Sequence, residues 1–355
     1  MGLQQVAQGQ APGAPPYVAG SQQATTLVYG RVRGVWGRRR KGRDVPRETP
    51  CLGWRVKRRY TLFVAARRVL PLMPTRALRI PYSPYIPFER PKMARILAIS
   101  NQKGGVGKTT TAVNLSAALA KSGQRVLVVD LDPQGNASSG LGYPRSQVTM
   151  GIYDALLDYR EVASVLLPTD MDTLQLIPAS RDLVGAEVEL VDEPGRERRL
   201  RKILNQVRDD YDWVVIDCPP SLGLLTLNAL TAADSVLIPL QAEYYAMEGL
   251  GELLRTVGAV RKSLNPDLMR EGIVLTMVDT RNNLCREVVE QTRELFEGEV
   301  FETWIPRNVR LGEAPSFGKS IVAYDPRSAG ARAYVKLAAE LLERRRPMAS
   351  VREAV

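Results

Sequence analysis

The chain has 355 residues, 45% of them hydrophobic, so it is long enough to bury one large core or two ordinary ones. It contains no histidine, which excludes Ser-His-Asp and Cys-His catalysis and any histidine-ligated metal site. Its three cysteines are far apart and form no Cys-x-x-Cys pair. We therefore expect neither a disulfide framework nor a cysteine zinc site, and a reducing, cytoplasmic setting.

The formal net charge of +11 is concentrated in the first quarter of the chain. Residues 1–92 hold 18 of the 49 basic residues and 3 of the 38 acidic ones, which leaves 31 basic and 35 acidic residues in 93–355. The main part of the chain is therefore slightly acidic. The high pI of the whole chain is no argument that this part binds nucleic acid.

Residues 1–92 are predicted to be a separate, largely disordered extension. The first 30 residues carry no charge, and six prolines between residues 71 and 91 disfavour both helix and central strand. The apolar stretch 60–73 is too short to span a membrane. Three interpretations stay open: a basic arm for nucleic acid, an arginine-rich targeting segment, or a mis-assigned start with the true start at Met93. We favour the last, because "MARILAISNQKGG" begins a strand at once.

From residue 93 to residue 345 short apolar runs alternate with helical stretches, and residues 346–355 form a short tail. The runs are rich in Val, Ile and Leu, as strands buried on both faces are. This alternation predicts an α/β fold: a doubly wound, mostly parallel sheet of about seven strands with helices on both faces. The expected strands are 95–100, 125–132, 174–179, 213–220, 235–241, 272–278 and 300–306, and the expected helices are 109–123, 222–234, 246–264, 286–297 and 329–345.

The segment "AISNQKGGVGKTTT" (98–111) follows the first predicted strand and opens the first predicted helix, which is the context of a phosphate-binding loop. Its glycines allow the backbone N–H groups to approach phosphate oxygens, and the helix adds its positive dipole end. Lys108 would reach the β- and γ-phosphates of ATP, and the Thr109 hydroxyl would bind Mg²⁺. The predicted nucleotide-binding residues of this loop are Lys103, Gly104, Gly105, Val106, Gly107, Lys108, Thr109 and Thr110.

Three carboxylates follow strands that should end at the same edge of the sheet. Asp130 and Asp132 close "VVDLD", and Asp217 closes "WVVID". Ligands of open α/β sheets bind at the carboxyl ends of the strands, so we expect these side chains beside the loop. Asp130 and Asp217 are predicted to hold Mg²⁺ together with Thr109. Without histidine, any hydrolysis must depend on positioning and electrostatics.

The loop departs from the standard GxxxxGK[ST] pattern, because Gln102 stands at its first glycine and Lys103 follows. "KGGVGKT" resembles the deviant Walker A motif of the MinD/ParA class of P-loop ATPases. The resemblance implies that Lys103 reaches the phosphates of a partner subunit, so that ATP binding and formation of a homodimer become one event. It also implies that Asp132 orients the attacking water, and that Lys103, Lys108 and Asp132 are the catalytic set.

The resemblance is greatest to ParA proteins of the Soj type. It rests on "DLDPQGNASSGLG", "DCPPSLGLLTLNALTAADSVLIPLQAEYYAMEGL" and "IPRNVRLGEAPSFGKSIVAYDPRSAGARAY", and it covers 93–345 and none of 1–92. It implies an ATP-dependent chromosome or plasmid partitioning protein of the cytoplasm that binds double-stranded nucleoid DNA without sequence preference. Pro306 and Asn308 would contact adenine, Arg281 and Arg310 would contact DNA, and a ParB-like centromere-binding protein would stimulate hydrolysis.

Four alternatives are weighed against this interpretation. A MinD-like ATPase would end in a basic amphipathic helix, whereas Pro347 interrupts the end of this chain, so no stable membrane association is expected. A reductase with an iron–sulfur cluster would need paired cysteines, which Cys218 and Cys285 do not resemble. A nucleotide-gated DNA scaffold and a ParA-like positioner of another cargo stay open.

Overall fold

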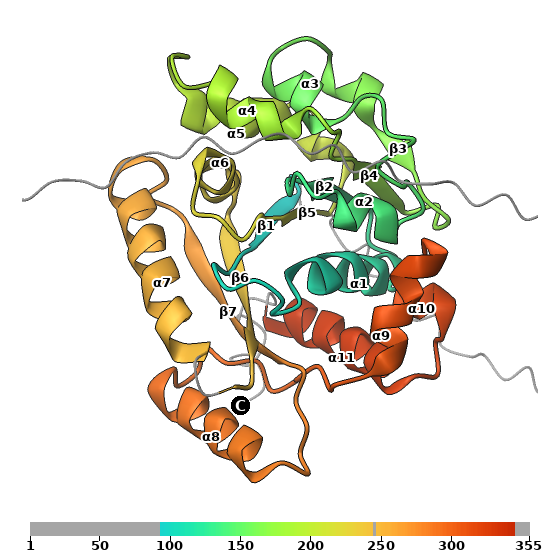
Figure 1. Ribbon diagram of the computed structural model, residues 1–355, viewed down its shortest axis with the longest axis vertical. Helices are drawn as coiled ribbons and strands as arrows, with labels where there is room; N and C mark the ends of the chain where they lie inside the picture. The colour runs from blue at the N-terminus through green and yellow to red at the C-terminus, as the bar shows by residue number, and fades with distance from the viewer. Residues whose placement is uncertain (1–92, 244–245, 345–355) are drawn as a thin grey trace, which may run out of the picture. The chain divides into compact units, whose positions relative to one another are not determined.

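A computed structural model describes residues 93–243 and 246–344, which form a seven-stranded sheet between two groups of helices (Figure 1). The order of the strands is β3-β4-β2-β5-β1-β6-β7, and every pairing is parallel except that of β3 with β4. This confirms the predicted doubly wound α/β class. The strands are β1 Arg95–Ile99, β2 Val126–Asp130, β3 Leu167–Pro168, β4 Leu174–Ile177, β5 Trp213–Asp217, β6 Ser235–Gln241 and β7 Met269–Thr276.

The set of seven strands differs from the predicted set at both edges of the sheet. The predicted strand 300–306 is wrong: only its ends form isolated bridges, Val300 with Ile273 and Pro306 with Val278. Between them the backbone N–H groups of Glu302 and Thr303 donate to the Glu340 carboxylate instead of to a neighbouring strand. The seventh strand is β3, whose two residues are too few to leave a periodic pattern in the sequence.

Each central strand is buried on both faces because its side chains alternate between two apolar cores. Ile96 and Ala98 of β1 lie in the core beneath α3–α7, whereas Leu97 and Ile99 lie in the core beneath α1 and α9–α11. Figure 1 shows these two groups of helices on opposite sides of the sheet. The helices are α1 Lys108–Lys121, α2 Asn136–Gly140, α3 Ile152–Leu156, α4 Leu183–Glu189, α5 Arg199–Leu204, α6 Leu224–Ala232, α7 Ala246–Ser263, α8 Asn283–Leu295, α9 Val309–Glu313, α10 Ile321–Tyr324 and α11 Ala329–Arg344, with 3-10 turns η1 Val162–Val165, η2 Arg196–Arg198, η3 Arg208–Asp210 and η4 Ala314–Phe317.

The register of the central strands brings three loops to one edge of the sheet. Asp217 pairs with Ile99 on one side and with Asp130 on the other, so β1, β2 and β5 end level with one another. The loop 100–107 leaves β1 at this level and leads into α1. The carboxyl edge of the sheet therefore holds the predicted phosphate loop and the predicted carboxylates side by side.

The predictions for 1–92 and for the tail 346–355 fall outside the described residues. Within the part of the chain that the structure does describe, no helix is both long enough and apolar enough to cross a membrane.

Candidate functional site

The loop between β1 and α1 has the backbone conformation that its glycines permit. Gly105 and Gly107 have φ angles of 75° and 89°, in the left-handed region that L side chains rarely adopt. Gly107 occupies the N-cap position of α1 and has no side chain with which to cap that end of the helix. The first backbone N–H groups of α1 are thus left to bind an anion at the mouth of the loop.

Two buried polar side chains that the sequence analysis missed hold this loop in place. The Thr276 hydroxyl, at the end of β7, donates to the Val106 carbonyl at 2.8 Å. The Asn101 amide donates to the Pro239 carbonyl of β6 at 2.8 Å, and its oxygen accepts from the Lys103 N–H at 3.0 Å. The available signal was a polar residue at the end of an apolar run, since Asn101 and Thr276 both occupy such positions.

The two lysines of the loop occupy different environments. Lys108 is 7% exposed, and its ammonium group donates to the Lys103 carbonyl at 3.1 Å. Burial lowers the pKa of Lys108, and the charge of Asp217 opposes that shift. The Lys103 side chain is one-third exposed, with Nζ 3.5 Å from a Glu243 carboxylate oxygen. Lys108 is therefore fixed under the loop, whereas Lys103 lies at the rim in a loose ion pair.

The carboxylates of Asp130 and Asp217 are fully buried next to each other. Burial raises the pKa of Asp130 to about 6, although hydrogen bonds from Ser138 oppose the rise. Burial and the charge of Asp130 raise the pKa of Asp217 well above its ordinary value, and the Thr109 hydroxyl and Lys108 oppose this more weakly. Among the described residues, neither Asp217 oxygen has a partner with normal hydrogen-bond geometry. Such a buried, unpaired carboxylate is suited to a cation.

Asp130 organises the loop that carries Asp132. One Asp130 oxygen accepts from the Asp132 N–H at 3.2 Å, and the other accepts from the Ser138 N–H and hydroxyl, both at 2.7 Å. Asp132 is 7% exposed, and its Oδ1 accepts from the Gln134 N–H at 2.9 Å. Both Asp130 oxygens are thus already occupied by the chain, whereas those of Asp217 are not.

The residues present fit a magnesium ion with few protein ligands. No group of three or more His, Cys, Asp or Glu side chains within 93–243 and 246–344 is arranged to hold a metal. Mg²⁺ bound with nucleotide needs no such cage, because one or two protein oxygens, substrate phosphates and water complete its octahedron. The Asp217 carboxylate and the neighbouring Thr109 hydroxyl supply oxygens of that kind.

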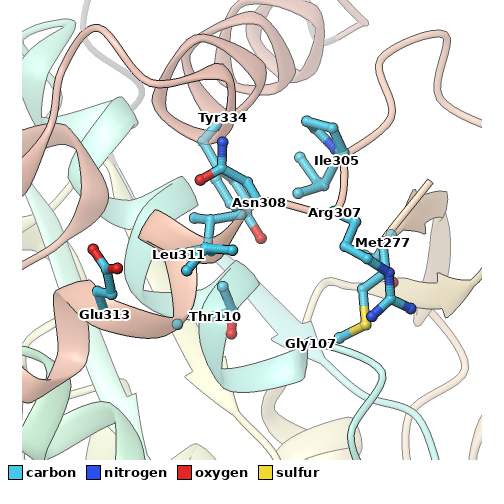
Figure 2. A pocket seen from close by; sticks show the side chains of 13 residues that line it. Gly107, Thr110, Met277, Ile305, Arg307, Asn308, Leu311, Glu313 and Tyr334 are labelled. Carbon is cyan, nitrogen blue, oxygen red and sulfur yellow. The ribbon is translucent and has the colours of Figure 1, made fainter. Parts of the chain in front are cut away.

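A cavity of about 510 Å³ adjoins the start of α1, a volume typical of small-molecule sites (Figure 2). Gly107 and Thr110 line one side of the cavity. Pro306 and Asn308, in the segment that leads into α9, line another part of it. The Asn308 side-chain oxygen accepts from the Arg310 N–H and caps α9, which leaves its amide nitrogen for a ligand. The remaining lining residues are Thr276, Met277, Ile305, Arg307, Val309, Leu311, Gly312, Glu313 and Tyr334.

The two arginines predicted to bind DNA come from adjacent segments of backbone. The Arg307 N–H donates to the Val278 carbonyl at 3.1 Å, so the segments that carry Arg281 and Arg310 start side by side. Their side chains are 89% and 55% exposed. Each is paired within its own chain: Arg281 with Asp279 at 2.8 Å, and Arg310 with Glu313 at 2.7 Å.

A strand, a glycine loop with a buried lysine, a helix and unpaired carboxyl oxygens at the sheet edge together define a P-loop nucleotide-binding protein. Residues 94–270 match the protein family described as "AAA domain". "Chromosome partitioning protein ParA" of Myxococcus xanthus is 57% identical over 255 residues, which are 72% of this chain and 90% of that protein. "Sporulation initiation inhibitor protein Soj" of Bacillus subtilis is 57% identical over 249 residues, 70% of this chain and 98% of that protein.

A solved structure extends the comparison to bound nucleotide. It is described as cobyrinic acid a,c-diamide synthase from Mycobacterium smegmatis with bound ADP and magnesium. It is 41% identical with a TM-score of 0.63, and the match covers 71% of this chain and 95% of that one. On these similarities the chain belongs to the ParA/Soj family of chromosome-partitioning ATPases, within the MinD/ParA group of P-loop proteins.

Proposed function

We propose that this protein hydrolyses ATP in a cycle in which the ATP-bound form is a homodimer that binds double-stranded DNA without sequence preference. The observation that carries the proposal is the second lysine of the loop. Lys103 lies at the rim and is one-third exposed, and among the described residues its ammonium group has a 3.5 Å ion pair with Glu243 and no other hydrogen-bond partner. An exposed pair of this kind contributes little, so the ammonium group can exchange Glu243 for a stronger anion.

ATP is proposed to bind along the loop from Gly104 to Thr110. The backbone N–H groups and Lys108 contact the phosphates, while the base enters the 510 Å³ cavity beside Pro306 and Asn308. Thr109 and Asp217 would hold Mg²⁺, and Asp130 would complete the set through water because its own oxygens are engaged by Asp132 and Ser138. When bound, Mg²⁺ neutralises phosphate charge and polarises the transferred phosphoryl group.

Hydrolysis needs a positioned water, and Asp132 is our candidate to orient it. The Asp132 loop is anchored to Asp130 and begins at the level of the phosphate loop. The water oxygen bonds to the γ-phosphorus as the bond from that phosphorus to the ADP oxygen breaks, and one water proton passes to the released phosphate. Lys108 stabilises the charge that develops on the phosphate oxygens. Lys103 of a second subunit would add a further positive charge at the same phosphates.

The DNA surface is proposed to be formed by Arg281 and Arg310. Sequence-independent binding requires only phosphate contacts, and a dimer presents each arginine twice. By family membership, a ParB-like partner stimulates hydrolysis and so releases the dimer from DNA. The protein would then be cytoplasmic and associated with the nucleoid while it holds ATP.

The test compares Lys103→Gln with Lys121→Gln, a matched change at an exposed lysine at the end of α1. Lys103→Gln should keep ATP affinity within about threefold, since Lys108 stays in place, and should abolish the ATP-dependent dimer in light scattering. Lys121→Gln should behave as wild type. An ATP-dependent dimer of unchanged stability in Lys103→Gln would refute the role of Lys103.

DNA binding is tested in the full chain with Asp132→Ala, which should accumulate the ATP state. Affinity for arbitrary duplex DNA should be much higher with ATP than with ADP and should fall steeply with salt. The basic segment 1–92 is present in both nucleotide states, so the difference between ATP and ADP isolates the nucleotide-gated part. Equal affinity in the two states would leave an ATPase whose nucleotide state does not govern DNA binding.

A further inference from the structure

Two glycines bring the segment after α2 into direct backbone contact with the end of η4, the turn that follows α9. A Cβ placed on Gly318 would lie 2.9 Å from the Gly142 Cα and 3.3 Å from the Gly142 nitrogen. Both residues have positive φ, 62° for Gly318 and 94° for Gly142. Only glycine satisfies the backbone conformation and the close approach together at Gly318.

Gly142 belongs to a segment that is bound firmly to the nucleotide site. Asp130 holds both Asp132 and Ser138 through hydrogen bonds of 2.7–3.2 Å, and Ser138 lies in α2. The Gly142 N–H donates to Ser139 at 3.2 Å, directly after that helix. The Asp132 loop, α2 and Gly142 are therefore linked by a continuous series of hydrogen bonds.

Gly318 belongs to a segment that carries Arg310. It ends η4, whose first residue, Ala314, directly follows α9, and Arg310 pairs with Glu313 at the end of α9. The same segment is attached to the P-loop helix, because the Ile321 N–H donates to the Asn114 side chain at 2.6 Å. Figure 1 shows α2 beside this group of short helices, which are the elements that the glycine contact joins.

We infer that the Gly142–Gly318 contact is a positioning device: it aligns α9 and Arg310 for DNA according to the state of the Asp132 loop, in addition to dimer formation. A contact between backbones contains no flexible side chain that could absorb a displacement, so the two segments must move together or separate. The inference rests on the proposed ATP-gated DNA binding. Besides dimer formation, it makes DNA binding depend on the alignment of α9 within each subunit.

The first experiment uses Gly318→Ala in the full chain, with Gly298→Ala as control. Gly298 has a similar φ of 75° but has no neighbouring atom within 4 Å of an added Cβ, so it reproduces the backbone strain without the collision. Gly318→Ala should form the ATP-dependent dimer as wild type does but bind DNA at least tenfold more weakly. Gly298→Ala should bind DNA normally. A Gly318→Ala dimer with wild-type DNA affinity overturns the inference.

The second experiment does not depend on a glycine variant that folds. Hydrogen exchange is measured on Lys103→Gln, which should bind ATP as a monomer, with ATP and with ADP. We expect ATP to change the exchange of both 136–142 and 314–320. A change confined to 136–142 overturns the inference and leaves the proposed function standing. If the wild-type protein shows no ATP-dependent DNA binding, the proposed function fails, and this inference fails with it.

Discussion

Charged side chains have opposite environments at the carboxyl edge of the sheet and at the surface that carries Arg281 and Arg310. At the sheet edge Lys108, Asp130 and Asp217 are buried, and backbone groups or neighbouring strands fix their positions. At the surface Arg281 and Arg310 are exposed, and carboxylates of the same chain balance them: Asp279 for Arg281, and Glu313 with Asp325 for Arg310. The sheet edge is therefore preorganised for a charged ligand. At the surface, each arginine must exchange its carboxylate partner for another anion before it can bind one.

The difference predicts different energies for the two regions. A buried charge interacts strongly and cannot be relieved by water, so its removal or neutralisation should have large effects. An exposed ion pair is screened by solvent and salt and contributes little. Substitutions at the sheet edge should therefore change binding and catalysis by orders of magnitude, and substitutions around the arginines by small factors.

The largest effect is expected for Lys108→Ala. The Lys108 ammonium group lies under the phosphate loop, where burial lowers its pKa. Its loss should weaken ATP binding and reduce hydrolysis by about 10³-fold, the scale of a lost preorganised donor. Phosphate release and equilibrium nucleotide binding measure this. Lys121→Ala is the matched control, and near-normal hydrolysis in Lys108→Ala would show that another cation contacts the phosphates.

The difference between the regions also decides what the sequence could predict. The phosphate loop and the aspartates were predictable, because glycines, Lys108 and strand-end carboxylates occupy fixed positions along a continuous pattern. The polar residues Thr276 and Asn101 could be noticed at the ends of apolar runs, but their partners could not be predicted. The partners depend on which strands become neighbours, since β6 and β7 contact the loop although they lie more than 100 residues away. The strand order of the sheet exists only after folding.

The same reason explains the errors at the edges of the sheet. Residues 300–306 have the apolar pattern of a strand, but two of their N–H groups donate to the Glu340 carboxylate. Because Glu340 is far away in the sequence, nothing within 300–306 indicates this interaction. Arg281 and Arg310 were predicted from family resemblance alone, because nothing in their local sequence distinguishes them from other exposed arginines. That their segments are adjacent is seen only in the folded chain, from the hydrogen bond between the Arg307 N–H and the Val278 carbonyl.

The next largest effect is expected for Asp217→Asn, which removes a buried carboxylate whose oxygens have no partner of normal hydrogen-bond geometry among the described residues. Because Asp130 repels it and burial disfavours its charge, the neutral variant should be more stable without ligand, by roughly 4 °C in Tm. In the wild-type protein, Mg²⁺ should add to the thermal stabilisation that ADP gives, and EDTA should remove this addition. In Asp217→Asn the addition should be absent even when Mg²⁺ is present. Thermal unfolding with and without each ligand measures both effects.

Asp209→Asn, at an exposed aspartate of η3, is the control for that experiment. It should alter neither the stability without ligand nor the response to Mg²⁺. A loss of stability in ligand-free Asp217→Asn would mean that the carboxylate is already compensated in the folded protein.

A smaller effect is expected for Thr276→Val, which keeps the shape of the side chain and removes its hydroxyl. The Val106 carbonyl would lose its 2.8 Å partner in a buried position, which costs about 1–3 kcal/mol. We expect KM for ATP to rise about tenfold, because the loop is no longer held in shape, and kcat to change less. Thr256→Val on α7, where the hydroxyl donates to the Glu252 carbonyl in an exposed position, should leave both constants unchanged.

The smallest effect has the opposite sign and is expected for Asp279→Asn. The Arg281 guanidinium lowers the pKa of Asp279 to about 2, so this carboxylate is charged in any ordinary assay. If Arg281 binds DNA as proposed, Asp279 would compete with DNA phosphate for it. The neutral variant should bind DNA about threefold more tightly in the ATP state, with an unchanged ATPase rate. Asp172→Asn, at an exposed site next to the β3–β4 edge, controls for the change in net charge. If both variants gain equally, the effect belongs to the net charge of the subunit; if Asp279→Asn alone gains, Arg281 contacts phosphate and its carboxylate partner limits the affinity for DNA.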